Sequence, residues 1–184
     1  VLATQNPIEQ EGTYLLPEAQ LDRFLFKLKV GYPSRTEERQ ILERLSKETK
    51  QKLQPVLSLP KILEIRKALE WIYVDERVKE YILRLVQATR AEGQLTPEEA
   101  DPKRLIDLRN WIQIGASPRA TLFLHQAAIA TALLEERTYV IPDDVKSVAH
   151  SVLRHRLILT FEAEAQGITT EDVIGKLLDT VTIP

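Results

Sequence analysis

The sequence predicts a mainly α-helical protein with a short strand-containing part at its N-terminal end. From Thr36 onward, apolar residues recur at the spacing of amphipathic helices. Alternation of the strand type is confined to the residues before Gly31. The 184 residues are 43% hydrophobic and 28% charged, which is ordinary for a soluble globular protein with its own core. We therefore expect two domains, residues 1–31 and residues 32–184, the second of them all-helical.

The N-terminal part is predicted to hold two strands joined through a loop and a short helix. Residues 1–5 form an apolar run that reads as a buried strand. Residues 17–21 favour a helical turn that begins with proline. Residues 24–30 alternate apolar and basic side chains, which predicts a half-buried strand. Residues 31–33 break this pattern, and Ser34 is placed to cap the next helix. The chain starts at Val and contains no methionine, so we expect a piece of a longer polypeptide.

The remainder is predicted to be a series of helices. Ser117 and Pro118 form the clearest helix start, an N-cap followed by proline at the first helical position. A surface loop is expected over residues 93–107, and a small strand pair between residues 72–74 and 139–141. The predicted helices cover residues 36–47, 59–69, 75–90, 117–136, 142–153 and 169–181, with residues 105–113 left open.

Composition excludes several kinds of protein. There are no cysteines, so disulfides and thiolate metal sites are absent. No apolar run approaches the ~20 residues of a membrane-spanning helix. The net charge of −2 and the lack of a basic stripe argue against a nucleic-acid partner. The histidines lack zinc-binding spacing.

Four short segments, taken in order, resemble the second half of a MoxR-type AAA+ ATPase module, and the resemblance extends over the whole chain. Residues 5–14 (QNPIEQEGTY) and 152–157 (VLRHRL) closely resemble the sequence motifs of that family. The four segments are residues 3–7 (ATQNP), 16–24 (LPEAQLDRF), 31–33 (GYP) and 115–120 (GASPRA). The resemblance implies the C-terminal end of a P-loop αβα core followed by an all-helical lid bundle.

The resemblance also implies an activity. Such a protein binds ATP with Mg²⁺, hydrolyses it, and works in the cytoplasm as a chaperone-like activator that remodels a client protein. Its subunits form a homo-oligomeric ring, by family analogy a hexamer. The sequence identifies neither the client nor the pathway.

Three separated polar residues are the candidates for catalysis. Asn6 follows a predicted strand end, where ligands bind in open α/β sheets, and the resemblance makes it the sensor that orients the attacking water. Arg23 resembles the arginine finger that acts on the ATP of a neighbouring subunit. Arg119 lies in the first turn of a helix, where a cation is misplaced unless an anion is near, and it resembles the second sensor of the terminal phosphate.

Each of these residues has a structural alternative. Asn6 can be a turn residue before a proline. Arg23 can pair with Asp22 or Glu18 within its own segment. Arg119 can lie exposed over its own apolar stem.

Residues at the junction of the two predicted domains are the candidates for binding the rest of the nucleotide. Tyr32 and Pro33 are candidates for the adenine pocket and a hinge, or else for ordinary core packing. Ser117 is a candidate for nucleotide contact beside Arg119.

Two essential parts of an ATPase are missing from the sequence. It contains no Gly-x-x-x-x-Gly-Lys-[Ser/Thr] phosphate loop. Asp75 and Glu76 follow an apolar run and mimic a magnesium-binding strand, but their position in the chain is too late for that role, and they are predicted to open a helix. We therefore expect the metal ligands upstream of Val1, and no hydrolysis by this chain alone.

Two other functions remain open. The chain can be a non-catalytic helical module for protein interaction, which a phosphate loop encoded upstream would argue against. It can also belong to a motor acting on nucleic acid, which salt-dependent DNA binding would support. Residues 154–156 (RHR) form a basic cluster that we expect on the lid surface or at a contact between subunits.

Overall fold

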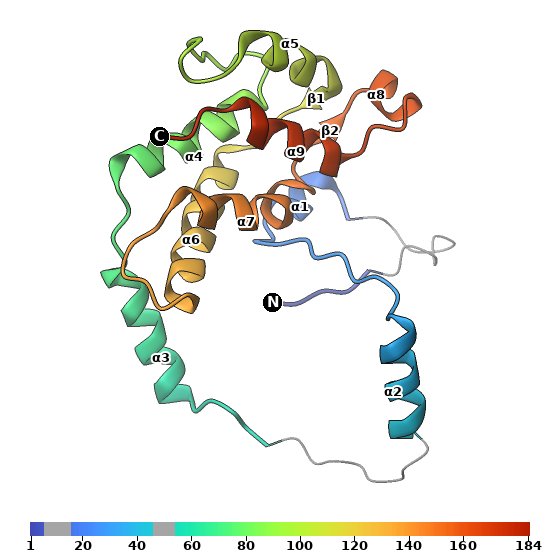
Figure 1. Cartoon of the computed structure of the whole chain (residues 1–184), viewed down its shortest axis with the longest axis vertical. Helices are drawn as coiled ribbons and strands as arrows, with labels where there is room; N and C mark the ends of the chain where they lie inside the picture. Colours follow the sequence, from blue (N-terminus) through green and yellow to red (C-terminus); the bar gives the residue numbers. More distant parts are fainter. Residues whose placement is uncertain (6–15, 46–53) are drawn as a thin grey trace.

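The computed structural model describes residues 1–5, 16–45 and 54–184 (Figure 1). Its helices and strands are α1 (Glu18–Leu21), α2 (Arg35–Leu45), α3 (Leu59–Ala68), the 3₁₀ turn η1 (Leu69–Trp71), α4 (Glu76–Ala88), α5 (Pro102–Trp111), β1 (Ile112–Ile114), α6 (Pro118–Leu134), α7 (Pro142–Leu153), β2 (Ile158–Leu159), α8 (Phe161–Ala165) and α9 (Thr170–Thr180). The mainly α-helical fold class is confirmed.

A single core holds α4 to α9 together, and we call residues 74–181 the helical body. Helix α6 packs against α7 and α4, and α9 packs against α5 and α7. Its largest buried side chains include Tyr81, Leu85, Leu124, Leu153 and Leu177, which are fully inaccessible to solvent. Burial of each of these leucine side chains stabilises the fold by roughly 1.5–3 kcal/mol. The body therefore carries the apolar core that the composition predicts.

Helix starts in the body agree with their sequence signals. The Asp75 carboxylate accepts from the Arg77 amide at 2.9 Å, so it caps α4 as predicted. Ser117 caps α6, with proline at the first helical position. Thr169 and Asp172 form a reciprocal capping box at the start of α9. Helix α7 has the predicted bounds.

Two features of the body differ from the predictions. The loop expected over residues 93–107 ends early, because Asp101 caps α5 and Pro102 begins it. The small sheet pairs β1 with β2, antiparallel, in two segments that were not predicted as strands. Tyr73 and Tyr139 do pair where a strand pair was expected, but only as an isolated bridge.

The two strands predicted in the N-terminal part are not formed in this structure. Residues 1–5 and 24–30 have no strand assignment, and Val1 and Leu2 are fully exposed. A strand needs a neighbouring strand with which to form hydrogen bonds, and the described residues provide no such strand beside these segments. Apolar patterning alone predicted strands without regard to their partners.

Helices α2 and α3 extend away from the body on separate sides (Figure 1). Helix α2 begins after Ser34, whose hydroxyl accepts from the Glu37 amide, so the predicted cap is confirmed. Its apolar residues Ile41 and Leu42 are 46% and 69% exposed. These helices therefore form from local signals without the burial that stabilises the body.

Candidate functional site

The start of helix α6 is held firmly against the end of α4. A Cβ added at Gly115 would lie 2.3 Å from the Thr89 carbonyl oxygen, so only glycine permits this approach. The Ala116 amide donates to Thr89 Oγ1 at 3.0 Å, and Arg90 Nε donates to the Ala116 carbonyl at 2.9 Å. The turn before Ser117 is thus fixed, and it fixes the first residues of α6.

The carboxylate of Asp22 lies at this helix start. Ser117 Oγ donates to its two oxygens at 3.0 and 3.1 Å. Arg119 Nη1 donates to Asp22 Oδ2 at 2.6 Å, and Arg156 Nε donates to Asp22 Oδ1 at 3.1 Å. We call these four residues, Asp22, Ser117, Arg119 and Arg156, the Asp22 cluster. Charge-assisted bonds of this kind are short and directional, so the cluster ties the N-terminal segment to the body at a defined position.

Arg156 also binds the backbone of the N-terminal segment. Its Nη2 donates to the carbonyl of Asp22 at 2.8 Å and to that of Phe24. Its side chain is 0% exposed and its guanidinium lies 4.8 Å from the centre of the Phe123 ring. Burial lowers the pKa of Arg156 to about 10, although the Asp22 carboxylate opposes the shift, so the group stays charged at neutral pH. The surface position expected for residues 154–156 is therefore wrong for Arg156.

His155 extends this contact by one more bond. Its Nε2 lies 3.0 Å from the Phe24 carbonyl oxygen. Burial lowers the pKa of His155 to about 4, despite the opposing effect of that carbonyl, so the imidazole is neutral at pH 7. Two consecutive side chains after α7 thus bind the same short stretch of backbone.

Arg23 lies between the two carbonyls that Arg156 binds, and its own side chain is exposed. Among the described residues, no hydrogen bond or ion pair of its guanidinium is present. The alternative of a pair with Asp22 is not formed, because that carboxylate is taken by Arg119 and Arg156. The role of Arg23 toward a neighbouring nucleotide stays a prediction.

Arg119 meets an anion at the start of α6, as its position in the first turn predicts. In this structure that anion is the Asp22 carboxylate. The Arg119 side chain remains 43% exposed, unlike that of Arg156. Its predicted contact with a terminal phosphate stays a prediction, as does the nucleotide contact of Ser117.

Of the other predicted site residues that the structure describes, Tyr32 and Pro33 are not brought to this cluster. Asn6 lies outside the described residues. Tyr32 is 91% exposed and Pro33 is exposed as well, in the stretch between the Asp22 cluster and α2. The adenine-binding role of these two residues stays a prediction.

A second polar cluster, which sequence reasoning missed, lies further along the same segment. Lys29 Nζ pairs with Glu171 Oε1 at 2.9 Å, and Arg154 Nε pairs with the same oxygen at 2.8 Å. His150 Nδ1 lies 2.6 Å from Glu171 Oε2, and Arg154 Nη1 donates to the Lys27 carbonyl at 2.8 Å. Burial would raise the pKa of Glu171, but hydrogen bonds from Lys29, His150 and Arg154 outweigh it and lower the pKa to about 2. We call these residues the Glu171 cluster.

Asp22, Arg156 and Glu171 were not predicted as site residues. The signal for Asp22 was its place beside Arg23, and the signal for Arg156 was the basic run at residues 154–156. Nothing in the sequence links either residue to the other, since 134 positions separate them. Glu171 sits in the first turn of α9, where an acid is already favoured by the helix.

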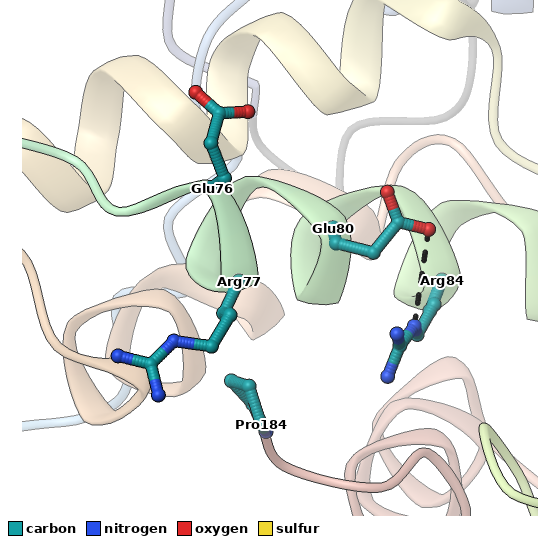
Figure 2. Close-up of a pocket in the computed structure, with 5 residues that line it drawn as sticks. All are labelled: Glu76, Arg77, Glu80, Arg84 and Pro184. Carbon is teal, nitrogen blue, oxygen red and sulfur yellow. Dashed lines mark ion pairs between the residues drawn. The ribbon is translucent and has the colours of Figure 1, made fainter.

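A shallow pocket lies elsewhere, along the exposed side of α4 (Figure 2). It is lined by Glu76, Arg77, Glu80, Arg84 and Pro184, and Arg84 pairs with Glu80 at 3.9 Å. None of the Asp22 cluster residues lines it. Its charged, solvated walls offer no defined ligand chemistry, so the Asp22 cluster remains the candidate site.

Comparisons with known proteins agree with this architecture. The model of the AAA lid domain matches residues 109–177, which include α6, α7 and both lid arginines of the Asp22 cluster. The model of the ATPase family associated with various cellular activities (AAA) matches residues 1–26, which include Asp22 and Arg23. The two matches meet in space at the Asp22 cluster.

Relatives match over the full chain. Chaperone MoxR1 of Mycobacterium tuberculosis is 46% identical over 184 residues, covering 100% of this chain and 46% of the relative. Protein MoxR of Methylorubrum extorquens is 30% identical, covering 100% of this chain and 55% of the relative. A crystal structure of a candidate ATPase from Cytophaga hutchinsonii superposes with a TM-score of 0.86 at 38% identity, over 98% of this chain and 52% of that one.

The lid and the core segment bound to it define the class: this is an AAA+ protein. Within that class, matches along its entire length place the chain with the MoxR-type proteins. The chain spans about half the length of the curated relatives it matches. In the described residues, no helix is long and apolar enough to cross a membrane, and no group of three acidic or histidine side chains is arranged to hold a metal ion.

Proposed function

We propose that this chain forms the lid and the finger-bearing edge of a cytoplasmic ATPase that remodels client proteins as a chaperone-like activator. The observation that carries the proposal is the Asp22 cluster. It joins the segment that holds an exposed arginine, Arg23, to the first turn of a lid helix that holds a second, Arg119. A guanidinium that stabilises the transferring phosphoryl group is a recurring part of nucleotide hydrolysis.

Each candidate residue has a defined task in this proposal. Arg119 leaves Asp22 to bind the terminal phosphate of ATP, while Ser117 keeps the helix start in place. Asn6 orients the attacking water. Tyr32 and Pro33 border the adenine base at the hinge. Arg23 stabilises the transition state on the ATP of the adjacent subunit, which requires a homo-oligomeric ring, by analogy of six subunits.

The observed partner of Arg119 supports its proposed task. The Asp22 carboxylate resembles a phosphate in two respects: it is anionic, and it accepts several hydrogen bonds at a helix start. Because Arg119 is partly exposed, exchange of Asp22 for a phosphate oxygen requires no unfolding of the body. A nucleotide that replaces Asp22 would therefore change the attachment between the lid and the core segment.

The phosphate loop and the magnesium ligands are proposed to lie in polypeptide that precedes Val1. The sequence contains no phosphate loop, and the curated relatives are about twice as long. Mg²⁺ would neutralise charge on the phosphates there. Alone, this chain is proposed not to hydrolyse ATP.

The proposal is tested by Arg23→Ala in the protein that includes the upstream core. ATP affinity is expected to persist, while the hydrolysis rate falls by about 10³–10⁵, the usual contribution of an arginine finger. Arg66→Ala, on an exposed position of α3, is the matched control and is expected to leave the rate unchanged. A rate unaffected by Arg23→Ala would overturn the assignment.

A further inference from the structure

Arg156 differs from the other two arginines of the site in burial and in what it binds. Its side chain is 0% exposed, whereas that of Arg119 is 43% exposed and that of Arg23 faces solvent. Among the residues that the structure describes, the Arg119 guanidinium binds the carboxylate of Asp22 alone, but Arg156 binds the carboxylate and the backbone. The guanidinium of Arg119 is therefore able to exchange partners, whereas that of Arg156 is fixed.

The backbone atoms that Arg156 binds are those on either side of Arg23. Its Nη2 donates to the carbonyls of Asp22 and Phe24, and its Nη1 lies 3.4 Å from the carbonyl of Leu25. The planar guanidinium is itself held by the Val152 carbonyl at the end of α7. The residue between these contacts, Arg23, has its backbone fixed relative to the lid while its side chain is exposed.

We propose that Arg156 is a positioning residue for the finger of its own subunit: by binding the backbone on both sides of Arg23, it makes the lid determine where that finger points. This inference rests on the proposed function and adds to it a direction of communication. Movement of α6 and α7 on nucleotide binding would be passed to Arg23, and so to the ATP of the next subunit. Neither the ATP nor the client is contacted by Arg156 itself.

Lysine is the informative substitution at this position. Arg156→Lys keeps the positive charge, but a single ammonium cannot bind two carbonyls and a carboxylate in the fork geometry of a guanidinium. Arg154→Lys is the matched control, because Arg154 holds the same segment through the carbonyl of Lys27, four residues beyond Arg23. Asp22→Asn removes the negative charge that Arg156 binds without changing the size of the side chain. It is the second variant of the test, for the case in which Arg156→Lys does not fold.

The test uses mixed rings of the full protein. One subunit type carries Arg23→Ala with an intact nucleotide site, and the other carries an intact finger with an inactivated upstream phosphate loop. Each type alone is expected to be inactive, and the mixture is expected to recover hydrolysis at the intact sites. Recovery establishes that Arg23 acts between subunits; without recovery, the proposed function itself fails.

Arg156→Lys is then introduced into one subunit type at a time. In the subunit type that carries the intact finger, which we call the finger donor, Arg156→Lys is expected to lower the recovered rate by about tenfold to a hundredfold. Misplacement of a catalytic group by ~1 Å has effects of that size. In the subunit that already lacks the finger, it is expected to leave the rate unchanged. Arg154→Lys in the finger donor is expected to have no effect, and Asp22→Asn a smaller loss.

Two outcomes overturn the inference while the proposed function stands. One is an equal loss with Arg156→Lys in either subunit type, which shows a general role in lid stability. The other is full recovery with Arg156→Lys in a folded finger donor, which shows that Arg23 needs no positioning by the lid. Circular dichroism of each variant confirms that its helices are retained.

Discussion

The helical body and the N-terminal segment, residues 16–44, are held by different kinds of contact. The body buries a continuous apolar core that includes Leu85, Leu124 and Leu177. No described side chain of the segment is fully buried, and it is attached through Asp22 and Lys29 to polar groups of the body. Apolar burial is non-directional and stabilises the fold, whereas hydrogen bonds to charged groups define geometry.

This difference assigns separate tasks to the two regions. The body is stable because of its core and provides a rigid base for the N-cap of α6 and the end of α7. The segment is placed on that base by a few directional bonds, so its position is sensitive to single polar substitutions. A site in which Arg23 must be aimed benefits from this kind of attachment.

The largest effect is expected from a cavity in the body. Leu124→Ala is expected to lower the free energy of unfolding by about 2–5 kcal/mol, because Leu124 is 0% exposed and its removal leaves a void. Leu42→Ala, at a position 69% exposed on α2, is the control and is expected to change it by less than about 0.5 kcal/mol. Urea denaturation followed by circular dichroism measures both. Equal effects would show that α2 shares the core.

A smaller effect is expected from the serine caps of α6 and α2. Ser117→Ala removes the cap of α6 and a donor to Asp22, and is expected to lower the free energy of unfolding by about 1–2 kcal/mol. Ser34→Ala removes the cap of α2, which does not pack in the core, so only exchange of the α2 amides is expected to rise. Urea denaturation and amide hydrogen exchange distinguish these results; a global loss with Ser34→Ala would contradict the separation of α2.

The smallest effect is expected at the Glu171 cluster, and it depends on pH. Because the folded pKa of Glu171 is about 2 and its ordinary value is 4.5, its ion pairs stabilise the fold fully above pH 4.5 and are lost as the pH falls toward 2. Glu171→Gln is therefore expected to be less stable than the parent at pH 7, by up to about 1 kcal/mol, with the gap closing toward pH 2. A gap that is the same at pH 7 and pH 2.5 in urea titrations would contradict this.

The sequence predicted the body better than the segment. Helices α4, α6 and α9 each have a polar N-cap side chain, and α7 begins with proline and two acidic residues. These start signals are local, and the apolar residues of each helix recur at short spacing, so a stretch of sequence displays both. Residues 1–5 and 24–30 were predicted as strands from apolar patterning, but a strand also needs a partner that no local pattern reveals. Helix α8 and the β1–β2 pair were missed because they are only 5, 3 and 2 residues long.

The candidate site was predicted only in part. An anion was expected near Arg119 because a cation in a first helical turn is a local conflict, and Ser117 was predicted as the N-cap of that helix; both local predictions are confirmed. The identity of that anion, Asp22, depends on a contact across 97 residues. Arg156 was expected on the lid surface or at a contact between subunits, as part of the basic run at residues 154–156. Its partners are the distant Asp22 carboxylate and backbone carbonyls, which the sequence does not display.

The central claim is that polar contacts from Arg156, and no apolar core, hold the segment around Arg23 on the body. Amide hydrogen exchange of the parent and of Arg156→Lys tests it most directly. The account predicts faster exchange at residues 20–27 in the variant, including the Lys27 amide that donates to Ser151, with unchanged protection in α4, α6 and α9. Uniformly faster exchange throughout the body, or unchanged exchange at residues 20–27, would contradict it.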